Sequence, residues 1–131
     1  MTRVNVGVCP TTLSRLHLMA EHREIKRIPN RIKKGNFSLV GQPQNFKLGT
    51  GHEKFFYTRL GYIKRRYEAI YAECIKRKYN IQYYGSAFEG IDPKYFGDYT
   101  PTESDRQLIL KRMADNAAKA AAKRAKKNEN L

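Results

Sequence analysis

The sequence TGHEKFFYTRLGYIKRRYEAIYAECIKRK, residues 50–78, carries the most regular apolar pattern in the chain. Its apolar side chains recur at alternating spacings of four and three residues, at Phe56, Leu60, Ile63, Tyr67, Ile70 and Cys74. This spacing places all of them on one face of an α-helix. Thr50 and Glu53 have the spacing of a capping box, in which each side chain accepts a hydrogen bond from the other residue's backbone amide. We therefore predict one long amphipathic helix from about residue 50 to residue 78.

A second helical pattern precedes this segment. Residues 13–28 carry apolar side chains at a rough helical period, and Thr11 or Thr12 is expected to cap the helix. Pro29 cannot donate a backbone hydrogen bond and disfavours helical geometry at the residue before it, so we expect a break or kink there. One further turn is expected to continue to Lys34, where the following glycine ends it.

A third helix is expected after the central one. It opens at Thr102, with Asp105 in the capping-box position. Residues 117–131, AAKAAAKRAKKNENL, favour a helix but offer little to bury, so we expect a basic Ala/Lys-rich tail, helical or frayed, beyond a domain that spans 1–116. The connecting stretches are expected to form long loops, at 35–51 and 79–101. The sequence thus predicts an all-α fold, a single compact domain of three main helices with long loops.

The charge of the chain points to a polyanionic partner. Lys and Arg number 26 against 12 Asp and Glu, which gives a net charge of +14 and a pI near 10.0. The excess lies in the three segments expected to be helical, which hold 24 of the 26 cations: 1–35, 52–78 and 102–131. Three basic helices can present one cationic face to a phosphate backbone, so nucleic acid is the expected partner. The alternative is that these are ordinary solvated helix surfaces.

Other features of the composition exclude several classes of protein. Hydrophobic residues make up 40% of the chain, which excludes a wholly disordered basic tail. No apolar run approaches the ~18 residues of a membrane span, and the N-terminus lacks a signal-peptide core, so we expect a cytoplasmic protein with no membrane partner. Cys9 and Cys74 are expected to be free thiols. No set of Cys and His residues has zinc-ligand spacing, so no metal is predicted.

Two candidate chemical sites lie near the N-terminus. His17, Glu21 and Glu24 are spaced four and three apart, which puts them on one helix face that continues to Arg27. A carboxylate among cations stays ionised at neutral pH and can stabilise a cationic intermediate, although surface ion pairs are the simpler interpretation of the spacing. Removal of Met1 would expose the α-amine of Thr2, whose pKa of about 8 leaves it partly unprotonated and able to attack a sugar carbon.

Four collinear blocks of sequence carry a resemblance to a known family. They are MTRVN with HLMAEHREI at 17–25 and Arg27, LGTGHEKFFYTRL at 48–60, AECIKRKYNI at 72–81 and GDYTP at 97–101. In these blocks the chain resembles the pyrimidine-dimer DNA glycosylase and abasic-site lyase family of the T-even phage endonuclease V type. The blocks cover roughly half of the chain, in order and at compatible spacing. The family's aromatic C-terminal stretch is replaced here by the Ala/Lys tail.

The resemblance implies a fold, a reaction and a set of site residues. It implies that residues 1–116 form an all-α DNA glycosylase domain that acts as a monomer on duplex DNA containing UV photoproducts. It also implies excision of cyclobutane pyrimidine dimers through an imine on the Thr2 α-amine, with Glu24 as the catalytic carboxylate, followed by β-elimination and without a cofactor or a metal. By the same resemblance, the expected DNA-binding residues are Arg3, His17, Arg23, Arg27 and Arg112.

Three alternatives remain open at this point. A non-enzymatic basic DNA-binding protein would explain the charge, but it gives no reason for Glu24 among arginines or for the four blocks. A related glycosylase or lyase acting on other damaged bases would share both features. A ribosomal-type RNA-binding protein is a third alternative that also accounts for the net charge.

Overall fold

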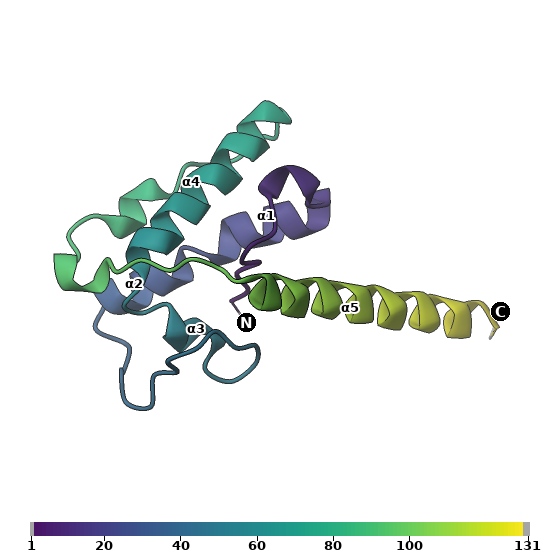
Figure 1. The fold of residues 1–131 in the computed structure, drawn as a ribbon. Coiled ribbons are helices and arrows are strands. Elements are labelled where there is room, and N and C mark those ends of the chain that lie inside the picture. Colours follow the sequence, from purple (N-terminus) through teal and green to yellow (C-terminus); the bar gives the residue numbers. More distant parts are fainter. Residues whose placement is uncertain (1, 130–131) are drawn as a thin grey trace.

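The computed structural model describes residues 2–129, which form an all-helical fold (Figure 1). The α-helices are α1 (Arg15–Glu24), α2 (Arg27–Lys33), α3 (His52–Phe55), α4 (Leu60–Lys76) and α5 (Glu103–Glu129). Short 3-10 turns occur at Pro10–Thr12, Gly85–Phe88 and Pro93–Tyr95. The described residues contain no β-strand, only one isolated bridge between Arg59 and Phe96. The predicted all-α class is confirmed, and α1, α4 and α5 are the long helices.

The first predicted helix is present, but its cap and its end differ from the prediction. Ser14 is the N-cap of α1, and its hydroxyl accepts a hydrogen bond from the backbone amide of His17 at 3.3 Å. Neither of the two expected threonines has this role. Helix α1 ends at Glu24, and Pro29 lies in the first turn of the next helix, α2. That position is compatible with proline, because amides in a first turn have no partner within the helix. The α2 helix ends at Lys33, and the residue at which it was expected to end, Lys34, is its C-cap.

The predicted continuous helix over 50–78 is wrong, because the chain forms two helices there. Helix α3 begins after Gly51, whose φ of 92° needs glycine, and no side chain caps it. The expected capping box at Thr50 is therefore absent. Between the helices, the carbonyl of Thr58 accepts from the amide of Gly97 at 3.0 Å, and the amide of Gly61 donates to the carbonyl of Gly97 at 3.0 Å. Because these backbone groups form hydrogen bonds with a distant loop, they do not continue the hydrogen-bond pattern of a helix. The apolar face of α4 itself is as predicted.

Helix α5 has the predicted start and extends further than its apolar residues do. The hydroxyl of Thr102 accepts from the amide of Asp105 at 3.0 Å, and the Asp105 carboxylate accepts from the amide of Thr102 at 3.2 Å, so this capping box is confirmed. Ile109 is the fully buried residue of α5. From Ala114 onward every described side chain is exposed, yet the helix continues to Glu129 and projects from the body of the molecule (Figure 1). Up to that residue, the Ala/Lys tail is helical.

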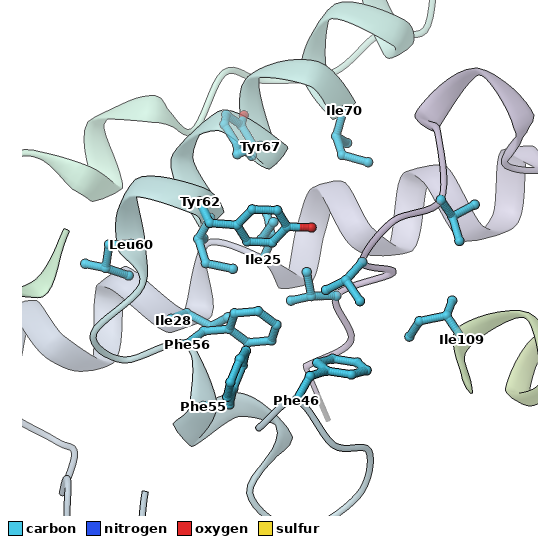
Figure 2. Close-up of a cluster of buried hydrophobic side chains, with 14 of the residues drawn as sticks. Ile25, Ile28, Phe46, Phe55, Phe56, Leu60, Tyr62, Tyr67, Ile70 and Ile109 are labelled. Carbon is cyan, nitrogen blue, oxygen red and sulfur yellow. The ribbon is translucent and has the colours of Figure 1, made fainter. Parts of the chain in front are cut away.

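The core lies between α1, α2, α3 and α4, and Figure 2 shows its central aromatic and aliphatic side chains. Phe46, Phe55, Phe56 and Tyr62 pack together with ring centroids 5.1–6.3 Å apart in the contacting pairs. The extended segment 2–8 passes through this core, where its three valines Val4, Val6 and Val8 are buried. Packing therefore holds this segment, whereas residues near a chain end usually have few contacts.

A buried ion pair joins α1 to α4 beneath this segment. Arg66 of α4 contacts the Glu21 carboxylate through Nε at 2.8 Å and a terminal nitrogen at 3.0 Å, and the two side chains are 7% and 0% exposed. The same carboxylate accepts from Asn5 Nδ2 at 2.8 Å. Arg66 also donates to the carbonyl of Val8 at 2.5 Å. The Glu21 carboxylate and the Arg66 guanidinium thus join α1 and α4 to the N-terminal segment.

Removing one member of this pair is expected to destabilise the fold strongly. Arg66→Met leaves Glu21 charged, buried and without its cation, and we expect a loss of about 3–5 kcal/mol in the free energy of unfolding. The double variant Glu21→Leu with Arg66→Met removes both charges and should recover part of that loss. Urea unfolding of the single variant, the double variant and an exposed control, Glu103→Gln, provides the comparison. A single variant as stable as the control would contradict the role given to this pair.

Candidate active site

The carboxylate of Glu24 lies against the N-terminal segment. Glu24 is the last residue of α1, and its Oε1 accepts a hydrogen bond from the backbone amide of Arg3 at 3.1 Å. The α-nitrogen of Thr2 belongs to the residue immediately before that amide. The fold therefore brings together the two residues that the sequence analysis assigned to chemistry, Thr2 and Glu24, although 22 positions separate them in the chain. Met1 lies outside the described residues.

Thr2 is buried and lines a cleft of about 710 Å³ between the N-terminal segment, α2, α5 and the loop before α3. The cleft has a strongly cationic lining, with the side chains of Arg27, Arg31, Lys47, Lys54 and Arg112. Glu53 is the carboxylate in this lining, and it is paired with Arg31 at 2.9 Å. A cleft with this excess of cations attracts an anionic ligand.

Arg112 links α5 to the same site. Its guanidinium donates to Asn5 Oδ1 at 2.9 Å, while Asn5 Nδ2 donates to the buried Glu21. Burial lowers the pKa of Arg112 from its usual value, and the nearby cation Arg3 acts in the same direction. Arginine nevertheless stays protonated at neutral pH. The amide of Asn5 thus fixes Arg112 at the mouth of the cleft, and the sequence pattern contained no signal for this contact.

The other residues expected to bind DNA are divided between the site and its surroundings. His17 lines a small cavity of about 20 Å³ together with Arg3, Glu24 and Arg112. Arg27, at the start of α2, lines the large cleft. Arg23 is exposed and lines neither cavity. The structure therefore brings all of the expected residues except Arg23 to the two cavities around Glu24 and the N-terminal segment.

His52 is a site residue that the sequence analysis missed. Its Nδ1 is 2.9 Å from the carbonyl of Lys47, so Nδ1 carries the proton, and Nε2 accepts from the amide of Val4 at 3.1 Å. A neutral imidazole therefore holds the N-terminal segment two residues from Thr2. His52 also lies in the resembling block 48–60, which was the available signal, but the resemblance implied no site residue in that block.

Tyr57 extends this network at the wall of the cleft. Its hydroxyl donates to Glu53 at 2.6 Å. Burial, together with this bond to a carboxylate, raises the pKa of Tyr57 to about 12. The phenol is therefore neutral at physiological pH and acts as a hydrogen-bond donor that orients Glu53 toward Arg31.

The arrangement can therefore bind a polyanion, and it holds the Glu24 carboxylate against the N-terminal segment. Within residues 2–129, no group of three or more His, Cys, Asp or Glu side chains is placed to hold a metal ion. No helix in that described part of the chain is both long enough and apolar enough to cross a membrane. Cys9 is exposed and Cys74 is buried, and both are free thiols.

The buried imidazole of His52 makes stability depend on pH. Burial lowers its pKa below the ordinary value of 6.5, so below pH 6.5 the unfolded chain takes up a proton that the native state resists. The free energy of unfolding should therefore fall as the pH is lowered from 6.5 toward 5. His22, whose pKa burial also lowers, adds to this slope. In urea titrations at several pH values, His52→Gln should give a flatter dependence than the wild type; equal slopes would contradict the assignment.

The sequence matches a known protein family. A family model described as pyrimidine dimer DNA glycosylase matches residues 1–83 of the 131-residue chain. The match contains both Thr2 and Glu24, and it also contains the His52 and Arg66 side chains that hold the N-terminal segment. Arg112 and the whole of α5 lie beyond it. Since the matched region covers more than half of the chain, the protein belongs to the pyrimidine dimer DNA glycosylase family.

Proposed function

We propose that this enzyme excises cyclobutane pyrimidine dimers through an imine formed by the α-amine of Thr2 and then cuts the DNA strand at the abasic site. The observation that carries the proposal is the hydrogen bond from the Arg3 amide to Glu24, because it places a carboxylate beside the residue with the nucleophilic amine. The resemblance described above supplies the roles. The packing of segment 2–8 supports the proposal, because a nucleophile at a frayed terminus would not be positioned for attack.

The proposed reaction begins with attack by the unprotonated amine. Its nitrogen forms a bond to C1′ of the damaged nucleotide, and the glycosidic bond breaks with its electron pair leaving on the base, which takes up a proton. The nitrogen then loses a proton, and its electron pair forms a double bond to C1′ while the bond from C1′ to the ring oxygen breaks. The ring oxygen takes up a proton, so the open sugar is joined to the enzyme as a protonated imine. In this proposal the carboxylate of Glu24 stabilises the cationic intermediates through its charge, and it takes up and returns the protons that are transferred.

Strand cleavage follows from the imine. The protonated imine draws electrons from the neighbouring carbon, so C2′ loses a proton to a base. The resulting electron pair forms a double bond between C2′ and C3′, and the bond from C3′ to its phosphate oxygen breaks. Water then releases the amine from the sugar. The imine is the electron sink for this β-elimination.

Access to C1′ requires distortion of the duplex. A base stacked in DNA shields its sugar, and moving a nucleotide out of the helix costs a few kcal/mol. A dimer stacks and pairs poorly, which lowers that free energy at the lesion. We propose that Arg3, Arg27 and Arg112 bind phosphates around the cleft and offset the remainder, with Arg23 on the flanking surface and His17 beside Glu24. The protein acts as a monomer in this proposal.

Glu24→Gln tests the assigned carboxylate. The substitution keeps the side chain's shape and an acceptor for the Arg3 amide, but it removes the negative charge. We expect single-turnover excision from a dimer-containing duplex to slow by about 100-fold or more, with DNA affinity nearly unchanged. Glu89→Gln, at an exposed carboxylate remote from the cleft, is the matched control and should keep full activity. Normal turnover by Glu24→Gln would refute the role of Glu24.

The position of the amine provides a second test. An extra residue at the N-terminus, or retention of Met1, moves the amine by about 3.8 Å and should reduce the rate 100-fold or more. Thr2→Ser leaves the amine in place and should be tolerated. Borohydride reduction of the enzyme with irradiated duplex should trap a covalent complex, and mass spectrometry should locate the sugar on the peptide that begins at Thr2. An adduct on an internal lysine would overturn the N-terminal mechanism while leaving the enzyme class intact.

A further inference from the structure

Helix α5 carries a row of cations along one face. Arg112, Lys119, Lys123 and Lys126 are separated by seven, four and three residues, which places them on one side of the helix. We call these four residues the α5 stripe. The three lysines are exposed, and no carboxylate among residues 2–129 forms an ion pair with them. Lys127 lies at the edge of the stripe.

The α5 stripe begins at the candidate active site. Arg112 lines the large cleft beside Thr2 and also the small cavity beside Glu24. Asn116, one turn further along the same face, lines that small cavity as well. The lysines of the stripe therefore continue the face that α5 presents to the site. Because α5 projects from the body of the molecule, they carry positive charge outward in one direction (Figure 1).

This part of α5 contributes nothing to the core, so packing does not account for it. Beyond Met113 all described side chains are exposed, and most of them are Ala, Lys or Arg. Intramolecular ion pairs do not account for this part of α5 either. A helix that is polar on all sides and has unpaired cations in register suits a ligand that supplies regularly spaced negative charge.

We propose that the α5 stripe binds the phosphate backbone of duplex DNA on one side of the lesion and extends the contact beyond the catalytic cleft. From Arg112 to Lys126 the helix rises about 21 Å at 1.5 Å per residue, which is on the order of two-thirds of a turn of B-DNA. Its lysines can each neutralise a phosphate without reading a base. This proposal rests on the proposed function, because the cleft sets where the duplex lies.

A pair of charge-matched double variants tests the proposal. The stripe variant, Lys119→Gln with Lys123→Gln, removes two charges from the stripe. The control variant, Lys111→Gln with Arg124→Gln, removes two charges from the same helix at positions about 90° and about 130° around the helix axis from the centre of the stripe. Glutamine has a helix propensity close to that of lysine, and circular dichroism verifies that α5 is retained. A third variant, Lys119→Arg with Lys123→Arg, keeps the charge and should behave as the wild type.

The first readout is the salt dependence of binding to an undamaged duplex of about two helical turns. The stripe variant should show a log–log slope shallower by about 1.8, because each phosphate that the protein no longer neutralises reduces the slope by about 0.9, and the control variant should change little. The second readout uses two duplexes that contain a stable abasic analogue. One duplex extends beyond the analogue on one side only, and the other extends beyond it on the opposite side only. The stripe variant should bind one of the two duplexes more weakly than the wild type does and match the wild type on the other.

The outcomes separate this proposal from the proposed function. Equal losses of affinity in the stripe variant and the control variant would overturn the stripe proposal, because they would mean that α5 acts only through net charge. Unchanged DNA binding by the stripe variant, or sedimentation showing that α5 pairs with a second copy of the chain, would overturn it as well. Binding to undamaged DNA requires no chemistry, so failure of the borohydride trap would refute the imine mechanism without altering the stripe result. A trapped enzyme with an inert stripe would refute only the stripe.

Discussion

The buried contact between Glu21 and Arg66 is the interaction on which the rest of the structure depends. An ion pair that is almost fully removed from water is tolerable only when its remaining hydrogen-bonding groups are satisfied, and here Asn5 and the carbonyl of Val8 satisfy them. Both of these partners belong to the N-terminal segment. The pair therefore joins the two long helices of the core and also fixes the course of the segment that leads to Thr2.

The proposed mechanism uses a backbone amine, and its central requirement is that the N-terminal segment be held in position. Chain ends usually fray, since few contacts hold them. Here three valines are buried, His52 accepts a hydrogen bond from the Val4 amide, and Glu24 accepts one from the Arg3 amide. These contacts replace the helix or strand that positions a catalytic side chain in other enzymes. Their combined effect is that residue 2 is buried beside a carboxylate and open to a cationic cleft.

The cations of the site and of the α5 stripe form two groups, one in the cleft beside the N-terminal segment and one further out along α5. Arg27 and Arg112 line the cleft itself, where the proposed function places the damaged nucleotide. The lysines of the α5 stripe lie further out on an exposed helix, where salt screens them over a Debye length of about 8–10 Å. Under the two proposals, contacts in the cleft orient the lesion, and contacts along α5 add affinity for the flanking duplex. The two sets meet at Arg112, which Asn5 connects to the buried Glu21.

The sequence alone determined the features that depend on neighbouring residues. These are the helical class, the apolar face of α4, the capping box of α5, the basic character of the surface and, through four blocks of resemblance, the family. Only the tertiary structure decided the features that depend on distant partners. Gly97 divides one predicted helix into α3 and α4, His52 anchors Val4, and the Glu21 carboxylate is buried rather than part of a surface ion pair. Helical periodicity reports which face a side chain occupies, but it contains no information about which segment, tens of residues away, will complete its hydrogen bonds.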